Sequence, residues 1–239
     1  MQIEVAMRSA LSLANHGLGL CYPNPSVGCV ILDKYNNLVG CGRTSNGGRP
    51  HAEMNALNSL VASPIGGTAF ITLEPCAHKG STPSCAELLI KSGIKRAYIS
   101  TIDPDRRTAG KGIKLLKEAG IEVFVGLCSE EAKNINFGFL KRINYGLPTV
   151  SLKIASSLDG KIGCHNGESK WITGELARTY GHILRAKYDV IVSGINSILK
   201  DNSNLNCRIK GLEKHSPVKV IVDTNLSIPL SSNVLKNIN

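Results

Sequence analysis

The 239-residue chain is organised around H-A-E-M-N-A-L at residues 51–57 and T-L-E-P-C-A-H-K-G-S-T-P-S-C at residues 72–85. His51 would supply one imidazole nitrogen, and Cys76 and Cys85 would supply two thiolates, which are ligand types that zinc prefers. Structural zinc sites fill all four positions with protein ligands, whereas catalytic sites keep one position for water. Three ligands therefore predict a catalytic zinc site that acidifies water toward neutral pH.

Glu53 fits this site better as a proton shuttle than as a fourth ligand. His51 and Glu53 lie two residues apart at the start of a predicted helix, so their side chains point in different directions. Zinc nucleobase deaminases combine H-x-E with P-C-x-x-C, and their glutamate moves protons without binding the metal. Here eight residues separate the two cysteines instead of two. The alternatives are a closed structural zinc site, or buried thiols beside an unrelated helix cap.

Composition predicts a soluble globular chain of one or two domains, because 42% of its residues are hydrophobic. The first residues carry Glu4 where a signal peptide would be basic, and no apolar run approaches the roughly 18 residues of a membrane span. We therefore expect a cytoplasmic protein without a membrane partner. The eight cysteines are scattered through the chain, which argues against a disulfide framework.

The formal charge of +10 raises the alternative of a nucleic-acid deaminase of the tRNA type. However, the lysines and arginines form no block, and aromatic residues make up only 5% of the chain, which leaves few platforms for base stacking. A phosphorylated small-molecule substrate and a lysine-rich surface account for the charge, so no nucleic-acid partner is expected. A non-catalytic, zinc-stabilised binding module is the other alternative, and Glu53 argues against it.

Alternating strands and helices predict an α/β sandwich, with helices on both faces of one sheet. The first region is expected to span residues 1–146 and the second residues 147–239, with the boundary at Y-G-L-P. Helices are predicted at 3–14, 51–62, 84–92, 111–119 and 175–185, and strands at 29–32, 38–41, 68–73, 96–101, 122–125, 149–155, 189–193 and 218–223.

These residues resemble the bifunctional deaminase/reductase family of riboflavin biosynthesis. The resemblance covers nearly the whole chain and includes the 51–57 and 72–85 stretches, with their long spacing between the cysteines. The other shared motifs are P-N-P-S-V-G at 23–28, D-P-D at 103–105, G-F-L-K-R at 138–142 and S-L-D-G-K at 157–161.

The resemblance implies a cytidine-deaminase-like three-layer α/β/α sandwich, followed by part of a dihydrofolate-reductase-like α/β domain. The first would be a zinc-dependent deaminase acting on 2,5-diamino-6-ribosylamino-4(3H)-pyrimidinone 5′-phosphate. The second would belong to a reductase that uses NADPH to open the ribosyl group. The family also suggests a homo-oligomer.

Position by position, the resemblance assigns zinc to His51, Cys76 and Cys85, and proton transfer to Glu53. Asn24 and Asp103 would recognise the substrate in the deaminase. In the reductase, the residues that would touch NADPH are Ala155, Trp171, Ser197, Asp201 and Thr224, and those that would touch the substrate are Ser169, Arg185, Leu205 and Arg208. An ordinary turn asparagine is the alternative for Asn24, and a core anchor is the alternative for Trp171.

The chain departs from the family pattern at two positions near the deaminase site. Ser81 stands where the family usually has a basic residue, and Asp105 stands where it usually has asparagine. Lys79 could supply the positive charge that Ser81 lacks. The family's reductase also continues past the position of Asn239, into a glycine-containing loop that would hold the cofactor phosphates at a helix start. We therefore expect this chain to deaminate the pyrimidine but to bind NADPH weakly and not to reduce the product.

Overall fold

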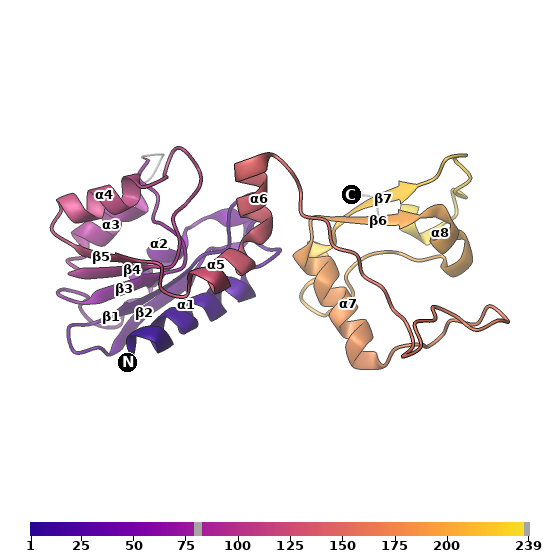
Figure 1. Ribbon diagram of the computed structural model, residues 1–239, viewed down its shortest axis with the longest axis horizontal. Coiled ribbons are helices and arrows are strands. Elements are labelled where there is room, and N and C mark those ends of the chain that lie inside the picture. Colours follow the sequence, from indigo (N-terminus) through magenta and orange to yellow (C-terminus); the bar gives the residue numbers. More distant parts are fainter. Residues whose placement is uncertain (79–82, 237–239) are drawn as a thin grey trace. The chain divides into compact units, whose positions relative to one another are not determined.

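The computed structural model describes residues 1–78 and 83–236 (Figure 1). Ser81 and Lys79, to which the sequence gives a role in substrate recognition, lie outside the described residues. The chain divides into two compact units, Met1–Val150 and Ser151–Asn239. None of the helices in the described ranges is both long enough and apolar enough to cross a membrane.

The first unit is built on one five-stranded sheet with the strand order β2-β1-β3-β4-β5. The strands are β1 (Gly28–Leu32), β2 (Leu38–Arg43), β3 (Thr68–Ile71), β4 (Arg96–Ile99) and β5 (Glu122–Val125). β1 pairs antiparallel with β2 and with β3, whereas β3, β4 and β5 run parallel. Parallel strands end at the same edge of a sheet, so the segments after β3 and β4 meet there.

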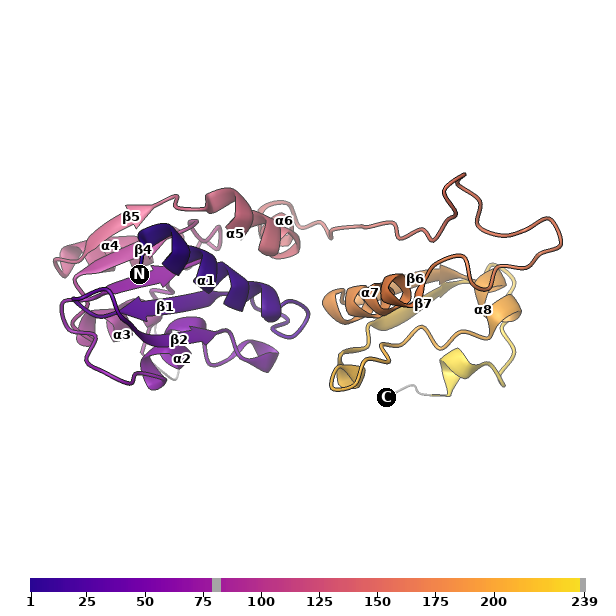
Figure 2. The same cartoon turned by 90° about the horizontal axis from the view of Figure 1, so that it is seen from below.

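Helices cover both faces of this sheet (Figure 2). The helices of the first unit are α1 (Ile3–His16), α2 (Ala52–Asn58), α3 (Cys85–Lys91), α4 (Lys111–Glu118), α5 (Ser129–Ile135) and α6 (Phe137–Tyr145), with a 3-10 turn at Asn46–Gly48. α1 and α5 lie on one face, and α2, α3 and α4 lie on the other.

Strand β1 shows why the unit has three layers, because every one of its side chains is buried. Val30 and Leu32 join the core under α1, whereas Cys29 and Ile31 point the opposite way into the core under α2, α3 and α4. Alternate residues of a strand face opposite sides of the sheet, so a continuous apolar run requires a cover on both faces. The predicted α/β/α sandwich is confirmed.

The second unit has a two-stranded parallel sheet of β6 (Val190–Gly194) and β7 (Val218–Val222). Its helices are α7 (Glu175–Lys187) and α8 (Ile195–Asp201), with 3-10 turns at Glu213–His215 and Asn233–Leu235. A small core forms around Ile198, Leu205 and Val234.

The strand predicted at 149–155 is wrong, because the structure has no regular secondary structure there. Val150 and Leu152 are each 85% exposed, so the alternating apolar residues face solvent instead of a core. Within the described residues, β6 and β7 pair with each other and leave this segment without a partner strand. Alternation favours a strand only where a neighbour supplies the backbone hydrogen bonds.

Candidate active site

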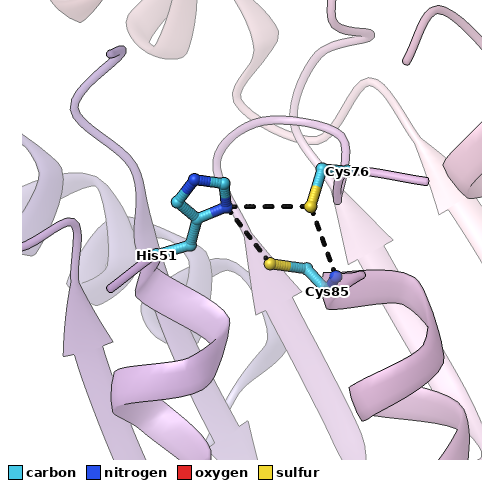
Figure 3. A group of neighbouring side chains, drawn as sticks. All are labelled: His51, Cys76 and Cys85. Atoms are coloured by element: carbon cyan, nitrogen blue, oxygen red, sulfur yellow. Dashed lines mark hydrogen bonds between the residues drawn. The ribbon is translucent and has the colours of Figure 1, made fainter. Parts of the chain in front are cut away.

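His51, Cys76 and Cys85 come together at the edge of the sheet where the segment after β3 meets the starts of α2 and α3 (Figure 3). The Nδ1 atom of His51 lies 3.7 Å from Sγ of Cys76 and 3.3 Å from Sγ of Cys85. Zinc bonds of normal length at tetrahedral angles would separate a nitrogen and a sulfur ligand by about 3.6 Å. The three side chains are therefore spaced as zinc ligands, with Nδ1 as the histidine atom that faces the thiols.

His51 and Cys85 owe their positions to the starts of two short helices, whereas Cys76 lies in the segment after β3. His51 is the N-cap residue of α2, and Cys85 is the first residue of α3. Ser84 and Glu87 form a reciprocal capping box that fixes the start of α3. The backbone N–H of Cys85 donates to Sγ of Cys76 at 3.3 Å. A backbone donor at a helix start favours the thiolate form of the sulfur that it contacts.

Hydrogen bonding divides the two thiols into one acceptor and one donor. The pKa of Cys76 is lowered to about 4, first by a hydrogen bond from the Cys85 thiol and also by His51. The same thiol–thiol hydrogen bond, together with burial, raises the pKa of Cys85. The hydrogen bond with Cys76 raises the pKa of His51. A divalent cation would take the place of the shared proton, because zinc binds cysteine as thiolate and histidine in its neutral form.

Glu53 is 3% exposed and lines the same cavity as His51 and Cys76. Burial raises the pKa of its carboxyl to about 7. It lies in the first turn of α2, and its carboxyl hydrogen-bonds the thiol of Cys85, so it lies directly beside the cluster. The role of Glu53 as a proton shuttle stays a prediction.

The cavity beside the cluster contains both residues predicted to recognise the substrate in the first unit, Asn24 and Asp103. The side-chain nitrogen of Asn24 donates to the carbonyl of Gly48 at 2.8 Å, which orients the amide. Gly48 has a φ of +87°, and a Cβ there would lie 2.5 Å from the Asn24 amide nitrogen. Only glycine suits this position, so the Asn24 side chain is held in place by its contact with Gly48.

Asp103 and Asp105 approach the cavity on the segment after β4. Burial raises the pKa of Asp103 to about 6, and the charges of Asp105 and Glu74 also raise it. Asp105 has the opposite shift: hydrogen bonds from Arg107 lower its pKa to about 2. The Nε atom of Arg107 lies 3.0 Å from both oxygens of Asp105, which holds the guanidinium at the rim of the cavity.

Several residues to which the sequence assigns no role also line this cavity, among them Arg49, Glu74, Arg107 and Phe139. Phe139 belongs to the G-F-L-K-R motif, so that motif could have been used to predict that Phe139 lies at the site. His78 also lines the cavity, and its Nδ1 atom is buried without a hydrogen-bond partner among the described residues. A buried polar atom without a partner is a candidate contact for a polar ligand.

In the second unit, Arg185 and Arg208 meet around His182. The Nη1 atom of Arg185 lies 3.3 Å from Nδ1 of His182, and the backbone N–H of Arg208 lies 3.3 Å from the same nitrogen. Burial and the two arginines lower the pKa of His182. The two arginines predicted to bind a phosphate are therefore near neighbours, while Leu205 is buried in the small core.

The residues predicted to contact NADPH are spread over several segments. Trp171 is 71% exposed, so the alternative that it anchors the core is wrong, and the guanidinium of Arg178 lies 4.4 Å from its ring centre. Ala155 is in a segment without regular structure, Ser197 and Asp201 are in α8, and Thr224 is in the turn after β7. Ser169, which is predicted to touch the substrate, also lies in a segment without regular structure.

The α/β sandwich with a His-Cys-Cys cluster and a buried glutamate defines the class of zinc-dependent deaminases. Two known domain families match the chain. Residues 1–101 match the cytidine and deoxycytidylate deaminase zinc-binding region, and residues 148–238 match the RibD C-terminal domain.

The riboflavin biosynthesis protein RibD of Aquifex aeolicus is 44% identical over 229 residues, which cover 96% of this chain and 64% of that protein. The structure of Acinetobacter baumannii RibD is 42% identical with a TM-score of 0.86, covering 98% of this chain and 67% of that one. A Thermotoga maritima structure is 39% identical with a TM-score of 0.90, and the match covers 98% of this chain and 66% of that one. The chain belongs to the RibD family, so the resemblance seen in its sequence is confirmed.

The chain thus spans a little under two thirds of the length of the curated Aquifex relative. The Thermotoga protein is described as a diaminohydroxyphosphoribosylaminopyrimidine deaminase/5-amino-6-(5-phosphoribosylamino)uracil reductase.

Proposed function

We propose that the first unit catalyses the hydrolytic deamination of 2,5-diamino-6-ribosylamino-4(3H)-pyrimidinone 5′-phosphate in riboflavin biosynthesis. The observation that carries this proposal is the convergence of His51, Cys76 and Cys85 in one cluster, beside a cavity that the buried carboxyl of Glu53 also lines. The name of the Thermotoga relative supports the choice of substrate.

His51, through Nδ1, and the two thiolates of Cys76 and Cys85 would hold the zinc ion. Two thiolates and a neutral imidazole would balance the charge of Zn²⁺ and would leave a ligand position open for water. Zinc bound there supplies Lewis-acid chemistry, which makes water a competent nucleophile near neutral pH. The match of residues 1–101 to a zinc-binding deaminase region supports this ligand set.

Glu53 would move the protons of the reaction. Hydrolysis joins the oxygen of water to the amino-bearing ring carbon and breaks the bond from that carbon to the amino nitrogen. A proton must leave the water, and the departing nitrogen must gain one to become ammonia. A single carboxyl beside the ligand cluster can accept the first proton and deliver it to the nitrogen. Burial of Glu53 keeps bulk water from competing for that proton.

Substrate recognition would use the polar groups that line the cavity. Asn24, oriented by its bond to Gly48, would hydrogen-bond the pyrimidine ring, and Asp103 would contact a second polar group. The unpartnered Nδ1 of His78 offers another polar contact. Arg49 and Arg107 also line the cavity, and a guanidinium matches the geometry of a phosphate group.

For the second unit, we propose the reductase role that the match to the RibD C-terminal domain supports. NADPH would contact Ala155, Trp171, Ser197, Asp201 and Thr224. The substrate would contact Ser169, Leu205 and the Arg185–Arg208 pair around His182. A cytoplasmic location, a homo-oligomer and the absence of a nucleic-acid partner stay predictions.

To test the deaminase proposal, the zinc-loaded chain is incubated with the diaminopyrimidinone phosphate. Ammonia release and the mass of the product are then measured. Each turnover should release one ammonia and replace an amino group by an oxygen. The chain stripped of zinc by a chelator should be inactive, and activity should return with added zinc. Turnover of an adenosine or cytidine in RNA, with none of the pyrimidinone, would overturn the proposal in favour of a nucleic-acid deaminase.

A further inference from the structure

Glu74 is a buried carboxylate that takes part in neither the ligand cluster nor the proton transfer. It lies between β3 and Cys76 and is 3% exposed. One oxygen accepts hydrogen bonds from the backbone N–H groups of Asp103 at 3.3 Å and Gly110 at 2.9 Å. The other oxygen accepts from the backbone N–H of Ile113 at 3.1 Å. One side chain thus binds three backbone groups that lie 29 to 39 residues further along the chain.

Two of these backbone groups belong to the start of α4. The N-cap residue of α4 is Gly110, which provides no side-chain cap, and the first turn contains no acidic residue. The first N–H groups of a helix need acceptors, and the positive end of the helix dipole favours a negative charge. Glu74 supplies the acceptors and the negative charge from a distant part of the chain. The fit is close, because a Cβ on Gly112 would lie 2.0 Å from the carbonyl oxygen of Pro75.

The segment between these contacts faces the cavity. Asp103, Asp105, Arg107 and Thr108 all line it, and they lie between the first and the last backbone group that Glu74 binds. The backbone N–H of Glu74 also donates to the carbonyl of Thr101 at 2.9 Å. The backbone and the carboxylate of Glu74 therefore both hydrogen-bond the segment after β4. Cys76 follows Glu74 by two residues.

We propose that Glu74 is a positioning residue, which fixes the substrate-facing segment 103–110 at a set distance from the His51, Cys76 and Cys85 cluster. The inference rests on the proposed deamination for its kinetic consequence, but not for its structural one. A carboxylate suits the role because it only accepts hydrogen bonds, whereas a glutamine would present its own N–H₂ donors to one of the N–H groups.

The experiment compares the zinc-loaded wild-type chain with Glu74→Gln, which keeps the size of the side chain. Glu118→Gln is the matched control, since Glu118 is an exposed carboxylate at the end of α4, the helix whose start Glu74 binds, and it pairs with Lys114. Metal content, amide hydrogen exchange and steady-state kinetics are measured for all three. Glu74→Gln should retain one zinc per chain and exchange faster at residues 103–113, while α1 and α2 stay protected. Its KM should rise at least about tenfold, with a much smaller fall in kcat.

The readouts separate positioning from a general structural role. Uniformly faster exchange, or equal loss of protection at α1 and at 103–113, would show that Glu74 only supports the fold and would overturn the inference. Unchanged exchange at 103–113 with an unchanged KM would also overturn it. A wild-type chain that releases no ammonia would instead refute the proposed function, and the exchange comparison would still decide whether Glu74 fixes the segment.

Discussion

The side chain of Asn136 hydrogen-bonds both backbone polar groups of Ser26, which lies 110 residues earlier in the chain. The Oδ1 atom of Asn136 accepts from the Ser26 N–H at 2.9 Å, and its Nδ2 atom donates to the Ser26 carbonyl at 2.8 Å. The guanidinium of Arg142 donates to the carbonyl of Pro23 at 2.8 Å. The junction of α5 and α6 therefore holds the P-N-P-S loop that presents Asn24 to the cavity.

We expect Asn136→Ala to destabilise the first unit and to weaken substrate binding. Asn136 is 4% exposed, so the variant leaves two buried backbone groups of Ser26 without partners. The loss should be about 2 to 4 kcal/mol of unfolding free energy, together with a higher KM because Asn24 is less well held. Urea unfolding and steady-state kinetics measure the two effects. Asn134→Ala changes an exposed residue of α5 and should leave both unchanged; equal behaviour of the two variants would contradict the prediction.

Replacing one thiol should remove the metal. Cys76→Ala leaves two of the three ligand atoms, so the affinity for zinc should fall by orders of magnitude and activity should disappear with it. Cys41→Ala changes an exposed cysteine away from the cluster and serves as the control. Metal analysis and the absorption spectrum of the cobalt-substituted chain provide the readouts. A spectrum of the cobalt-substituted wild type that requires four protein ligands would refute the open position.

The sequence was most informative where a residue type has few uses. Histidine, glutamate and two cysteines in one short window predict the cluster, because few structures other than a metal site need that combination. The buried strand β1 was equally readable, since a run without polar residues must be covered on both faces. Both features are local in the sequence, and both agree with the structure.

Contacts between distant segments could not be read in the same way. Nothing near Glu74 in the sequence indicates that its carboxylate caps a helix that begins at Lys111, and nothing near Asn136 indicates Ser26. The helices at 129–135 and 137–145 were not predicted, and few of their side chains are buried. The strand expected at 149–155 failed for a related reason, because its pattern could not show whether a partner strand exists.

Glu53→Gln should separate metal binding from proton transfer. The amide has nearly the shape of the carboxyl but cannot carry a proton between water and the leaving nitrogen, so kcat should fall by about 10²-fold or more. One zinc per chain should remain, because the ligand atoms are those of His51, Cys76 and Cys85. Metal analysis and kcat are measured on the same preparation. Full activity would remove Glu53 from the mechanism, and loss of zinc would make it a ligand.

Asp103 should give the unfolding free energy a distinctive dependence on pH. Its pKa is raised from 3.8 to about 6, mainly by burial, so the folded chain holds this proton more tightly than the unfolded chain does. The contribution of Asp103 to the unfolding free energy is therefore fully present below about pH 4 and decreases as pH rises through 6. Above that pH the contribution is absent. The side chain is partly exposed, so solvent screening should limit the effect to about 1 to 2 kcal/mol.

The measurement compares the unfolding free energies of the wild-type chain and Asp103→Asn from pH 4 to pH 7.5. The side-chain oxygen of asparagine can still accept a hydrogen bond from the backbone N–H of Asp105, so the variant should lose only the ionisable group. Protonation of the zinc ligands affects both proteins equally and cancels when their unfolding free energies are subtracted. The wild type should become less stable relative to the variant as pH rises. Asp105→Asn should stay nearly flat over this range, because Arg107 lowers the pKa of Asp105 to about 2 and the stability that this group contributes is lost only as pH falls below about 4. A flat difference for Asp103→Asn would mean that the carboxyl is solvated in the folded chain.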